Sequence, residues 1–500
     1  TLLAVAYLWR PLSPSRLRWP VGHILPAASV LQDGVSWPCD GSLHHEPFCV
    51  NQCTGHGDCH VGFCRCHAGW YGQDCSRKRA GTEMEPAARA HAPAPTYLRE
   101  VDAGSNLVAA TVYDMPTAYT SRMLQYRHGG DACLWRRFAD NNDSFVMLTT
   151  YSVEIYMHEA MLQSDHRTFD PEEADFFYVP MYVTCYVWPI MGWSDHPWWH
   201  APIGELRTAG RTRGETSPTR AGPMAPLLRF PSPFLFNMIT EAHEWLQQFP
   251  WWSRRGGRDH IWLMAHDEGA CYMPTHVFNA SIVLTHWGRT ELNHTSNTAY
   301  DADNYNLKTD LRGWKGADWQ DKMAGHPCYL PDKHLVIPAF KIPGHAIHSP
   351  LMGAPPLVRD LLLFFRGDLG SGRKNHYSRG IRQKLFHLAH DGNWAERHKI
   401  YIGNSETVPG PYSEYLARSK FCLVAPGDGW SPRLEDAMLH GCVPLIVMDG
   451  VHAVFESILE YDSFSIRLPE ADLARVPELL AAVPPERLLA YQRNLARVWH

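Results

Sequence analysis

Short runs of apolar residues recur along the chain from residue 107 onward, and segments with helical periodicity separate them. In the first half these runs lie at 107–116, 173–183, 258–269, 281–288 and 333–340, with helical patterns at 151–164 and 234–249. Runs that are apolar throughout are typical of strands buried on both faces, and their alternation with helices is typical of a parallel sheet. The pattern predicts an α/β domain over residues 105–350.

A second series of the same kind begins near residue 359. Its apolar runs are "LLLFF", "KIYIG", "FCLVAP", "VPLIV" and "FSIRL", with helical patterns at 379–390, in "PYSEYLARS" and near the C-terminus. This series predicts a second α/β domain over residues 351–500. Two such units predict two Rossmann-like domains that face each other across a cleft, with ligands bound beyond the carboxyl ends of the strands.

The first hundred residues have a different composition. The apolar start "TLLAVAYLW" and the Pro-, Arg- and Ser-rich stretch after it predict the remnant of an N-terminal membrane anchor and a stem over residues 1–36. A cysteine-rich module follows over 37–78, and an Ala- and Pro-rich linker over 79–104 connects it to the first α/β domain. Polar segments at 204–226 and 289–327 predict surface loops.

The net charge of the chain argues against two classes of function. A formal net charge of −6 over 500 residues argues against a nucleic-acid-binding protein and against a membrane-surface protein, since both need basic surface. Sequons at Asn142, Asn279 and Asn293 predict N-glycosylation, which agrees with a chain of the secretory pathway.

Cys39 and six further cysteines lie within residues 39–75. A segment this small and this poor in aliphatic residues needs covalent cross-links, which predicts disulfides and an oxidising compartment. A zinc site is the alternative, because "CRC" and nearby histidines are metal-binding residue types, but paired C-x-x-C knuckles are missing. The six cysteines of the predicted module are Cys49, Cys53, Cys59, Cys64, Cys66 and Cys75.

The ending C-x-C-x-x-G-W-x4-C of this module closely resembles an EGF-like module. The resemblance implies pairing of the first cysteine with the third, the second with the fourth and the fifth with the sixth. The implied disulfides are Cys49–Cys59, Cys53–Cys64 and Cys66–Cys75. The partners of Cys39 and of the six cysteines from Cys133 onward stay open.

Residues 431–447, "SPRLEDAMLHGCVPLIV", follow the glycine-rich "PGDGW" and predict a helix and then a buried strand. Ser431 suits the N-cap and Pro432 suits the first helical position. Arg433 and Asp436 lie on the face opposite the apolar one, which consists of Leu434, Ala437 and Met438. Free N–H groups at such a helix start suit a phosphate, whereas the alternative is an Arg–Asp pair on a solvated face.

Four segments resemble the exostosin-type glycosyltransferases. In chain order they are "TFDPEEADFFYVPMY", "GGRDHIWLMAHDEG", "LLLFFRGDL…YSRGIRQKL" and "SKFCLVAPGDGWSPRLEDAMLHGCVPLIV", and the match covers roughly residues 107–498. The resemblance implies a GT-B fold with the nucleotide-sugar donor mostly on the C-terminal domain. It also implies a type II Golgi membrane protein, inversion at the anomeric carbon and no obligatory metal.

A UDP-sugar donor leaves as a diphosphate, so the enzyme must stabilise negative charge on phosphate oxygens. Arg433 is the first candidate, because a guanidinium binds phosphate in a bidentate manner. Asp436 matches the acidic position of the family and is expected to accept from ribose hydroxyls. The remaining candidates for this cradle are Ser431, Gly427 and Gly429.

A second basic loop, "FRGDLGSGRKNHYS", follows the strand "LLLFF". Arg366 fits the arginine that the family carries there, and Arg373 and Lys374 are further candidates for the donor. The alternative is an exposed basic loop without a ligand. A P-loop is excluded, because Arg373 and Lys374 follow Gly372 at the two places where the motif requires Lys and then Ser or Thr.

Inversion requires a general base near the acceptor hydroxyl. "AHDEG" ends a predicted strand, which makes His266 and Asp267 the candidate bases, with Glu159 and Glu268 as alternatives. The aromatic cluster at 188–200 offers sugar-stacking candidates, although packing explains it equally well. These candidates are Trp193, Trp198 and Trp199.

The sequence therefore predicts an inverting glycosyltransferase of the Golgi lumen that uses a UDP-sugar to extend a polysaccharide or a glycoprotein glycan. No metal is expected, since Asp301-Ala-Asp303 lies in a polar insertion and not at a strand end. A homo- or hetero-dimer is a further expectation. The alternative function is a secreted, EGF-containing glycan-binding protein with an inactive GT-B domain. Donor sugar, acceptor and linkage stay open.

Overall fold

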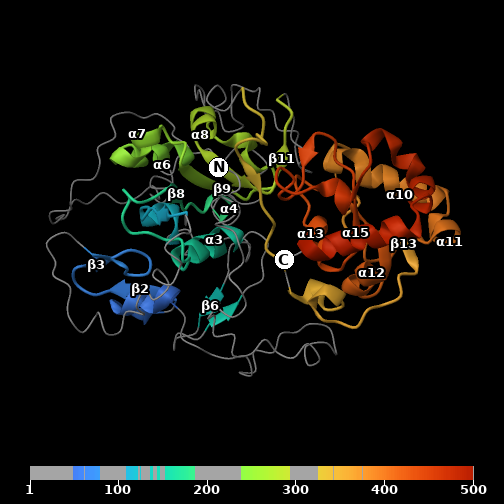
Figure 1. Ribbon diagram of the computed structural model, residues 1–500, viewed down its shortest axis with the longest axis horizontal. Coiled ribbons are helices and arrows are strands. Elements are labelled where there is room, and N and C mark those ends of the chain that lie inside the picture. Colours follow the sequence, from blue (N-terminus) through green and yellow to red (C-terminus); the bar gives the residue numbers. More distant parts are fainter. Residues whose placement is uncertain are drawn as a thin grey trace, which may run out of the picture.

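The computed structural model contains two α/β units and a small disulfide-rich module packed against the first of them (Figure 1). It describes residues 49–60, 62–78, 108–121, 124, 136–138, 144–146, 152–185, 238–292, 325–341, 343–373 and 375–498. The predicted anchor and stem, the linker and the loop at 204–226 lie outside these residues. Within them, no helix combines the length and the apolar character needed to span a membrane.

The first unit contains a five-stranded parallel sheet. Its strands in spatial order are β12 (Leu335–Val336), β10 (Ile282–Thr285), β9 (His260–Met264), β8 (Phe176–Val179) and β5 (Ala110–Val112). Phe177 of β8 faces one apolar cluster and Tyr178 faces another, so both faces of the sheet are buried. This double burial explains the continuous apolar runs in the sequence.

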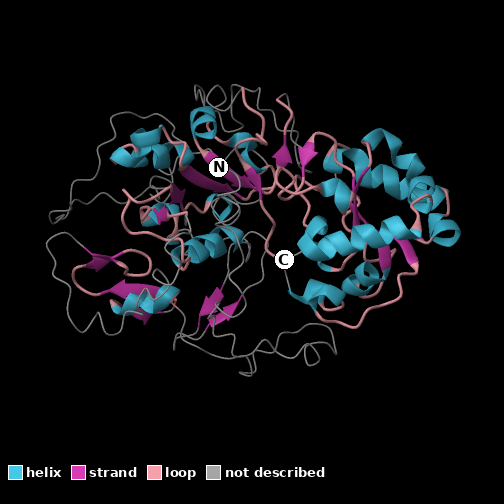
Figure 2. Ribbon diagram, in the orientation of Figure 1, coloured by secondary structure: helices cyan, strands magenta, loops and turns pink. Residues whose placement is uncertain are grey.

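Helices cover both faces of this sheet (Figure 2). They are α3 (Val153–Leu162), α4 (Val183–Cys185), α6 (Met238–Leu246), α7 (Pro250–Arg255) and α8 (Thr275–Ala280). Met157 of α3 packs on one face, and Ile239 of α6 packs on the other. The strand predicted at 173–183 is shorter than expected, because the chain leaves the sheet after Val179 and enters α4.

The second unit contains another five-stranded parallel sheet. Its strands in spatial order are β14 (Ile400–Gly403), β13 (Leu361–Arg366), β15 (Ser419–Val424), β16 (Val443–Ile446) and β18 (Ile466–Arg467). The chain passes from β13 to β14 on one side and then crosses to β15 on the other. Strand order therefore reverses at β13, and the loops on its two sides diverge there.

Helices also cover both faces of the second sheet. They are α10 (Ile381–Asp391), α11 (Trp394–His398), α12 (Tyr412–Arg418), α13 (Arg433–Leu439), α14 (Val476–Ala481) and α15 (Pro485–Val498). Leu385 of α10 packs with Phe365 on one face, and Leu416 of α12 packs with Phe364 on the other.

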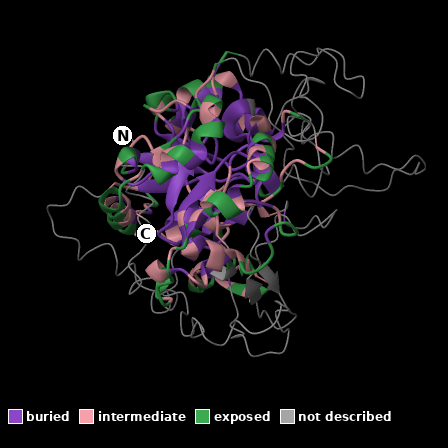
Figure 3. Ribbon diagram, turned by 90° about the vertical axis from the view of Figure 1, so that its right-hand side faces the viewer, coloured by how far each residue is buried: buried purple, intermediate pink, exposed green. Residues whose placement is uncertain are grey.

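The two units are in direct contact. β11 (Gly288–Arg289) of the first pairs with β17 (Val451–His452) of the second, and a Cβ on Gly288 would overlap the His452 carbonyl. One apolar cluster contains Trp262 of the first sheet and Ile446 of the second. Figure 3 shows this buried interior as the purple centre of the ribbon.

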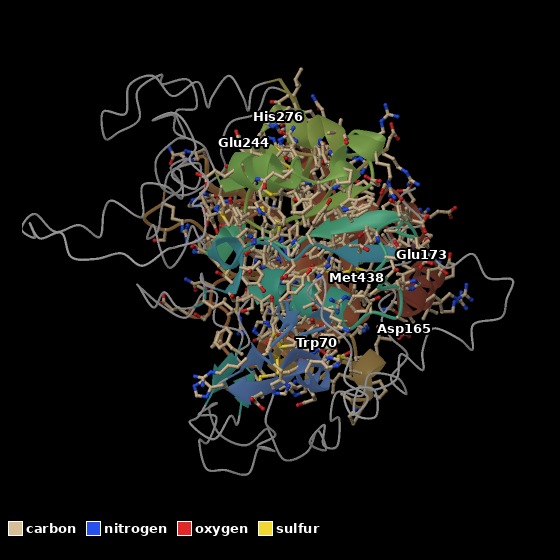
Figure 4. The ribbon with its side chains drawn as sticks, turned by 90° about the vertical axis from the view of Figure 1, so that its left-hand side faces the viewer. Trp70, Asp165, Glu173, Glu244, His276 and Met438 are labelled. Atoms are coloured by element: carbon tan, nitrogen blue, oxygen red, sulfur yellow. A yellow bond between two sulfur atoms is a disulfide. The ribbon has the colours of Figure 1, made fainter. Side chains whose placement is uncertain are left out.

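The disulfide-rich module has the three disulfides that the EGF resemblance implies, which are Cys49–Cys59, Cys53–Cys64 and Cys66–Cys75. These bonds exclude the zinc alternative for these cysteines. Figure 4 shows their yellow sulfur atoms near Trp70, whose ring stacks on His56 at a centroid distance of 3.5 Å. Elsewhere Cys271–Cys328 and Cys422–Cys442 are bonded, and Cys185 is also in a disulfide.

The remaining elements are short. They are β1 (Gly57–His60) with β2 (Phe63–Cys66), β3 (Trp70–Tyr71) with β4 (Arg77–Lys78), β6 (Arg136–Phe138) with β7 (Ser144–Val146), and the 3₁₀ turns η1 (Val50–Gly55), η2 (Thr117–Tyr119), η7 (Gly269–Tyr272), η8 (Pro343–Ala346), η9 (Pro350–Met352), η10 (Tyr377–Gly380), η11 (Tyr461–Ser463) and η12 (Glu470–Arg475).

Candidate functional site

A pocket of about 510 Å³ lies where the second sheet meets the segment that follows β12. It adjoins the carboxyl ends of β13 and β14 and the start of α13, the edge at which parallel sheets bind ligands. Its lining residues are Phe340, Lys341, His345, Arg366, Gly367, Asp368, Asn404, Ser405, Tyr412, Pro432, Arg433 and Asp436. The pocket brings together three donor-site candidates from two separate loops: Arg366, Arg433 and Asp436.

The Arg433 side chain packs against the end of β13. Its Nε donates to the Arg366 carbonyl at 3.2 Å, and its guanidinium carbon lies 4.9 Å from the centroid of the Phe365 ring. A Cβ on Gly367 would overlap this guanidinium, so a larger residue at this position would displace the Arg433 side chain. The arginine is thus held in one orientation by the backbone beside it.

Arg366 is held in a similar way by neutral groups. Its Nη1 donates to the Gly410 carbonyl at 2.6 Å and to the Val408 carbonyl at 3.2 Å. Its guanidinium carbon lies 5.2 Å from the centroid of the Tyr412 ring. In the described parts of the chain, no carboxylate forms an ion pair with Arg366 or with Arg433. The two carboxylates of the lining, Asp368 and Asp436, pair with Arg373 and Lys341 instead. Two cations without an ion pair among the described residues therefore line one pocket, which suits a dianionic ligand.

Asp436 is buried and already bound on both of its oxygens. Lys341 Nζ lies 2.5 Å from Oδ1, and the Tyr412 hydroxyl donates to Oδ2 at 3.1 Å. Burial and the charge of Asp436 together raise the pKa of Tyr412 above its usual range, which keeps this phenol protonated as a donor. The alternative of an Arg–Asp pair on a solvated face is wrong, because Lys341 and Tyr412 cover Asp436.

The start of α13 also differs from the prediction. The helix begins at Arg433, one residue later than expected, and Pro432 takes the N-cap position without a side-chain cap. Ser431 does not cap the helix, and its Oγ instead accepts from Arg433 Nη1 at 3.4 Å. Since Lys341 Nζ donates to the Pro432 carbonyl at 2.8 Å, a distant segment shapes this turn. Local propensity alone could not predict that contact.

Gly427 and Gly429 lie outside the pocket lining. A Cβ on Gly429 would overlap the Asp267 carbonyl oxygen, which also accepts from the Trp430 N–H at 3.2 Å. The "PGDGW" loop of the second unit therefore packs against the "AHDEG" loop of the first. Glycine is needed at 429 for this close approach between the two units.

Three of the candidate bases lie in the "AHDEG" loop at this junction, and the fourth, Glu159, lies on α3. Asp267 is half-buried, whereas His266, Glu268 and, on α3, Glu159 are buried. Burial lowers the pKa of His266 to about 4, although the negative charge of Asp428 acts to raise it, so the imidazole is neutral at pH 7. Asp267 is the most exposed of the four candidates.

Arg373 does not line the pocket. It pairs with Asp368 at 2.7 Å and with Asp428 at 3.0 Å, so two carboxylates match its charge and tie the loops together. Lys374, Asn142, Asn293 and the three tryptophans Trp193, Trp198 and Trp199 lie outside the described residues. Asn279 is exposed at the end of α8, which leaves this sequon accessible.

The sequence reasoning missed Lys341 and Tyr412. Lys341 is the first cation after the last strand of the first sheet, and Tyr412 opens a helix of the second unit. The position of Lys341 directly after a strand of the first unit was the only sequence feature that could have marked it as a site residue. Nothing in the spacing of Lys341 connects it to Asp436, which lies 95 positions further along the chain.

Residues 111–198 and 224–483 match the Exostosin GT47 domain. The chain belongs to the exostosin GT47 family. Its enzyme class is therefore that of a glycosyltransferase. Arg366, which fits the arginine that the family carries, and Arg433, the first candidate for the phosphates, lie in a single pocket.

Several plant proteins are similar over 77% of this chain. A probable glucuronoxylan glucuronosyltransferase of Arabidopsis thaliana is 27% identical over 391 residues, which is 66% of that relative. A probable glucuronosyltransferase of Oryza sativa subsp. japonica is 27% identical over 398 residues, with 72% of its length covered. A probable beta-1,4-xylosyltransferase of Arabidopsis thaliana is 27% identical over 394 residues, with 73% covered. The chain spans about two thirds to three quarters of the length of these relatives.

Proposed function

We propose that the protein is an inverting glycosyltransferase that uses a UDP-sugar to extend a polysaccharide or a glycoprotein glycan. The observation that carries this proposal is the pair of uncompensated guanidinium groups, Arg366 and Arg433, in one pocket at the strand-order reversal of the second sheet. A GT-B arrangement, in which the second unit holds the donor, is consistent with this position.

The proposed chemistry assigns each pocket group a role. Arg433 and Arg366 stabilise the charge that develops on the UDP leaving group, so the mechanism includes no obligatory metal. Lys341 holds Asp436 in place. When the donor binds, Asp436 Oδ2 gives up the hydrogen bond that it accepts from the Tyr412 hydroxyl and accepts one from a ribose hydroxyl instead. Asp267 is the proposed general base, since it reaches solvent at the junction of the two units.

The proposed setting is the Golgi lumen, with an N-terminal anchor and an EGF-like module in front of the transferase. The disulfides in the module and in both α/β units support an oxidising compartment. The names of the relatives select the first donors to screen. UDP-glucuronic acid and UDP-xylose therefore come before other UDP-sugars.

Thermal unfolding of the secreted chain of residues 37–500, with and without UDP and in EDTA, tests the donor site. Ligand at about one hundred times its dissociation constant stabilises a protein by about 2.7 kcal/mol, which raises the melting temperature. We expect this shift in the wild type and its loss in Arg433→Ala. Arg475→Ala is the matched control, because Arg475 is an exposed arginine with a carboxylate partner.

The opposite outcome is equally informative. No shift with UDP or with any other nucleotide contradicts the proposed donor site and favours the alternative of a glycan-binding protein with an inactive transferase fold. A shift that requires a divalent cation contradicts only the metal-independent part of the proposal. If UDP still raises the melting temperature of Arg433→Ala, this arginine is not part of the UDP site.

A further inference from the structure

Arg382, in α10, is a buried cation that the proposed mechanism does not use. Its side chain is 3% exposed. Nη1 donates to the Tyr377 hydroxyl at 2.8 Å and to the Asp368 carbonyl at 3.2 Å, and Nη2 donates to the Ala425 carbonyl at 3.0 Å. All of these acceptors are neutral, and Nε has no hydrogen-bond partner among the described residues.

The charge of Arg382 is therefore not compensated by contact. Within the described residues, no carboxylate forms an ion pair with it. Its guanidinium carbon lies 5.3 Å from the centroid of the Phe365 ring, the same ring on which Arg433 lies at 4.9 Å. Two like charges near one ring repel each other, and a buried cation without a counter-ion is costly. An anion in the adjacent pocket would relieve both effects.

The hydrogen bonds of Arg382 also connect the segments that build the pocket. Asp368, one of its acceptors, lines the pocket together with Gly367. Ala425, another acceptor, is the first residue after β15 on the way to Arg433. The third acceptor, Tyr377, lies in η10, the turn before α10. A single guanidinium thus fixes the relative positions of both loops.

We infer that Arg382 is a positioning residue for the diphosphate of the donor: it holds the two pocket loops in register and supplies a further positive charge next to the Asp368 carbonyl. This inference rests on the proposed function, because it presumes that a nucleoside diphosphate occupies the pocket. It predicts that the contribution of Arg382 appears only for ligands that carry phosphate.

Comparison of UDP with uridine tests this inference. We measure both dissociation constants by calorimetry for the wild type, Arg382→Gln and Arg382→Lys. In Arg382→Gln we expect UDP to bind about tenfold more weakly, as the loss of a nearby buried charge predicts, and uridine to bind as before. Arg382→Lys retains the charge and should recover part of the UDP affinity.

Arg359→Gln is the matched control. Arg359 is another partly buried arginine whose described acceptors are backbone carbonyls, but it precedes β13 and so lies at the opposite edge of the sheet. We expect it to lower the melting temperature without changing the ratio of UDP to uridine affinity. Tyr377→Phe removes one acceptor of Arg382 with little loss of packing, and it replaces Arg382→Gln in the comparison if that variant does not fold. Tyr377→Phe should weaken the binding of UDP and leave the binding of uridine unchanged.

Two results overturn the inference. One is unchanged UDP affinity in Arg382→Gln, or in Tyr377→Phe where the glutamine variant does not fold. The other is an equal loss of UDP and uridine, which indicates a merely structural role. A wild type that does not bind UDP contradicts the proposed function itself, and that outcome is distinct from both.

Discussion

At the residue scale, the pocket combines two kinds of cation. Arg366 and Arg433 are held by carbonyls and aromatic rings and keep their charge for a ligand, whereas Lys341 is committed to Asp436. The same positive charge therefore has a binding role in one case and a structural role in the other. Contact geometry, and not residue type, separates the two.

The Lys341–Asp436 pair gives a prediction at this scale. Lys341→Gln leaves a buried carboxylate without its cation, so the free energy of unfolding should fall by about 3–5 kcal/mol. The double variant Lys341→Gln/Asp436→Asn removes both charges and should recover most of this loss. Urea unfolding of the two single variants and the double variant measures the coupling. Strictly additive effects would show that the pair is not coupled.

At the element scale, the disulfide-rich module packs against the first α/β unit and is not an independent domain on a flexible linker. Arg167 Nη1 pairs with Asp74 of the module at 2.7 Å, and both side chains are almost fully buried. Asn51 donates to the carbonyl of Leu162, the last residue of α3, at 3.2 Å, and Val50 joins the cluster of Met157. Figure 1 shows the blue module beside α3.

This docking predicts cooperative unfolding. Asp74→Asn breaks a buried ion pair and should destabilise the whole first unit by about 3–5 kcal/mol. The charge of Arg167 and the hydrogen bonds to Asp74 lower the pKa of this carboxyl despite its burial, which favours the carboxylate form. Asp58→Asn, at a highly exposed module residue, is the control. A separate, earlier unfolding transition of the module in the wild type would contradict the prediction.

At the scale of the whole molecule, the two units form one body with a continuous apolar cluster and a shared β-ladder. The site depends on this junction, because Lys341 comes from the segment after the first sheet and binds the start of a helix of the second. We therefore expect neither unit to bind the donor by itself.

Buried histidines make the stability of this body sensitive to acid. Burial lowers the pKa of His243, His266, His286 and His440 to about 4, below their ordinary value of 6.5. The unfolded chain therefore binds more protons between pH 6.5 and 4, so their stabilising contribution is complete above pH 6.5 and is lost as pH falls through this window. The melting temperature should fall steeply from pH 7 to pH 5.

His286→Gln checks this dependence. His286 forms no ion pair within the described residues, and its Nδ1 bonds the Ile337 carbonyl at 2.9 Å, which a glutamine amide can also do. The variant should be less stable at pH 7 but should lose less on acidification, since one proton-binding group is gone. An unchanged pH slope would show that His286 does not contribute to the acid sensitivity.

The order of apolar and polar residues was sufficient to predict the two series of strands and helices. Strands buried on both faces must be apolar throughout, and helices must repeat their apolar positions. Sequence motifs also indicated the family, Arg366 and Arg433, and, through the EGF resemblance, the three cysteine pairs. These features are encoded within short segments, where spacing alone carries the information.

Which strands are neighbours became known only from the folded chain, and this places the strand-order reversal beside β13. The same holds for the cover that Lys341 provides over Asp436, for the burial of His266 and for the contact between units at Gly429. One cause is common to all of these. Each depends on contacts between residues far apart in the chain, and neither local propensity nor periodicity specifies such contacts.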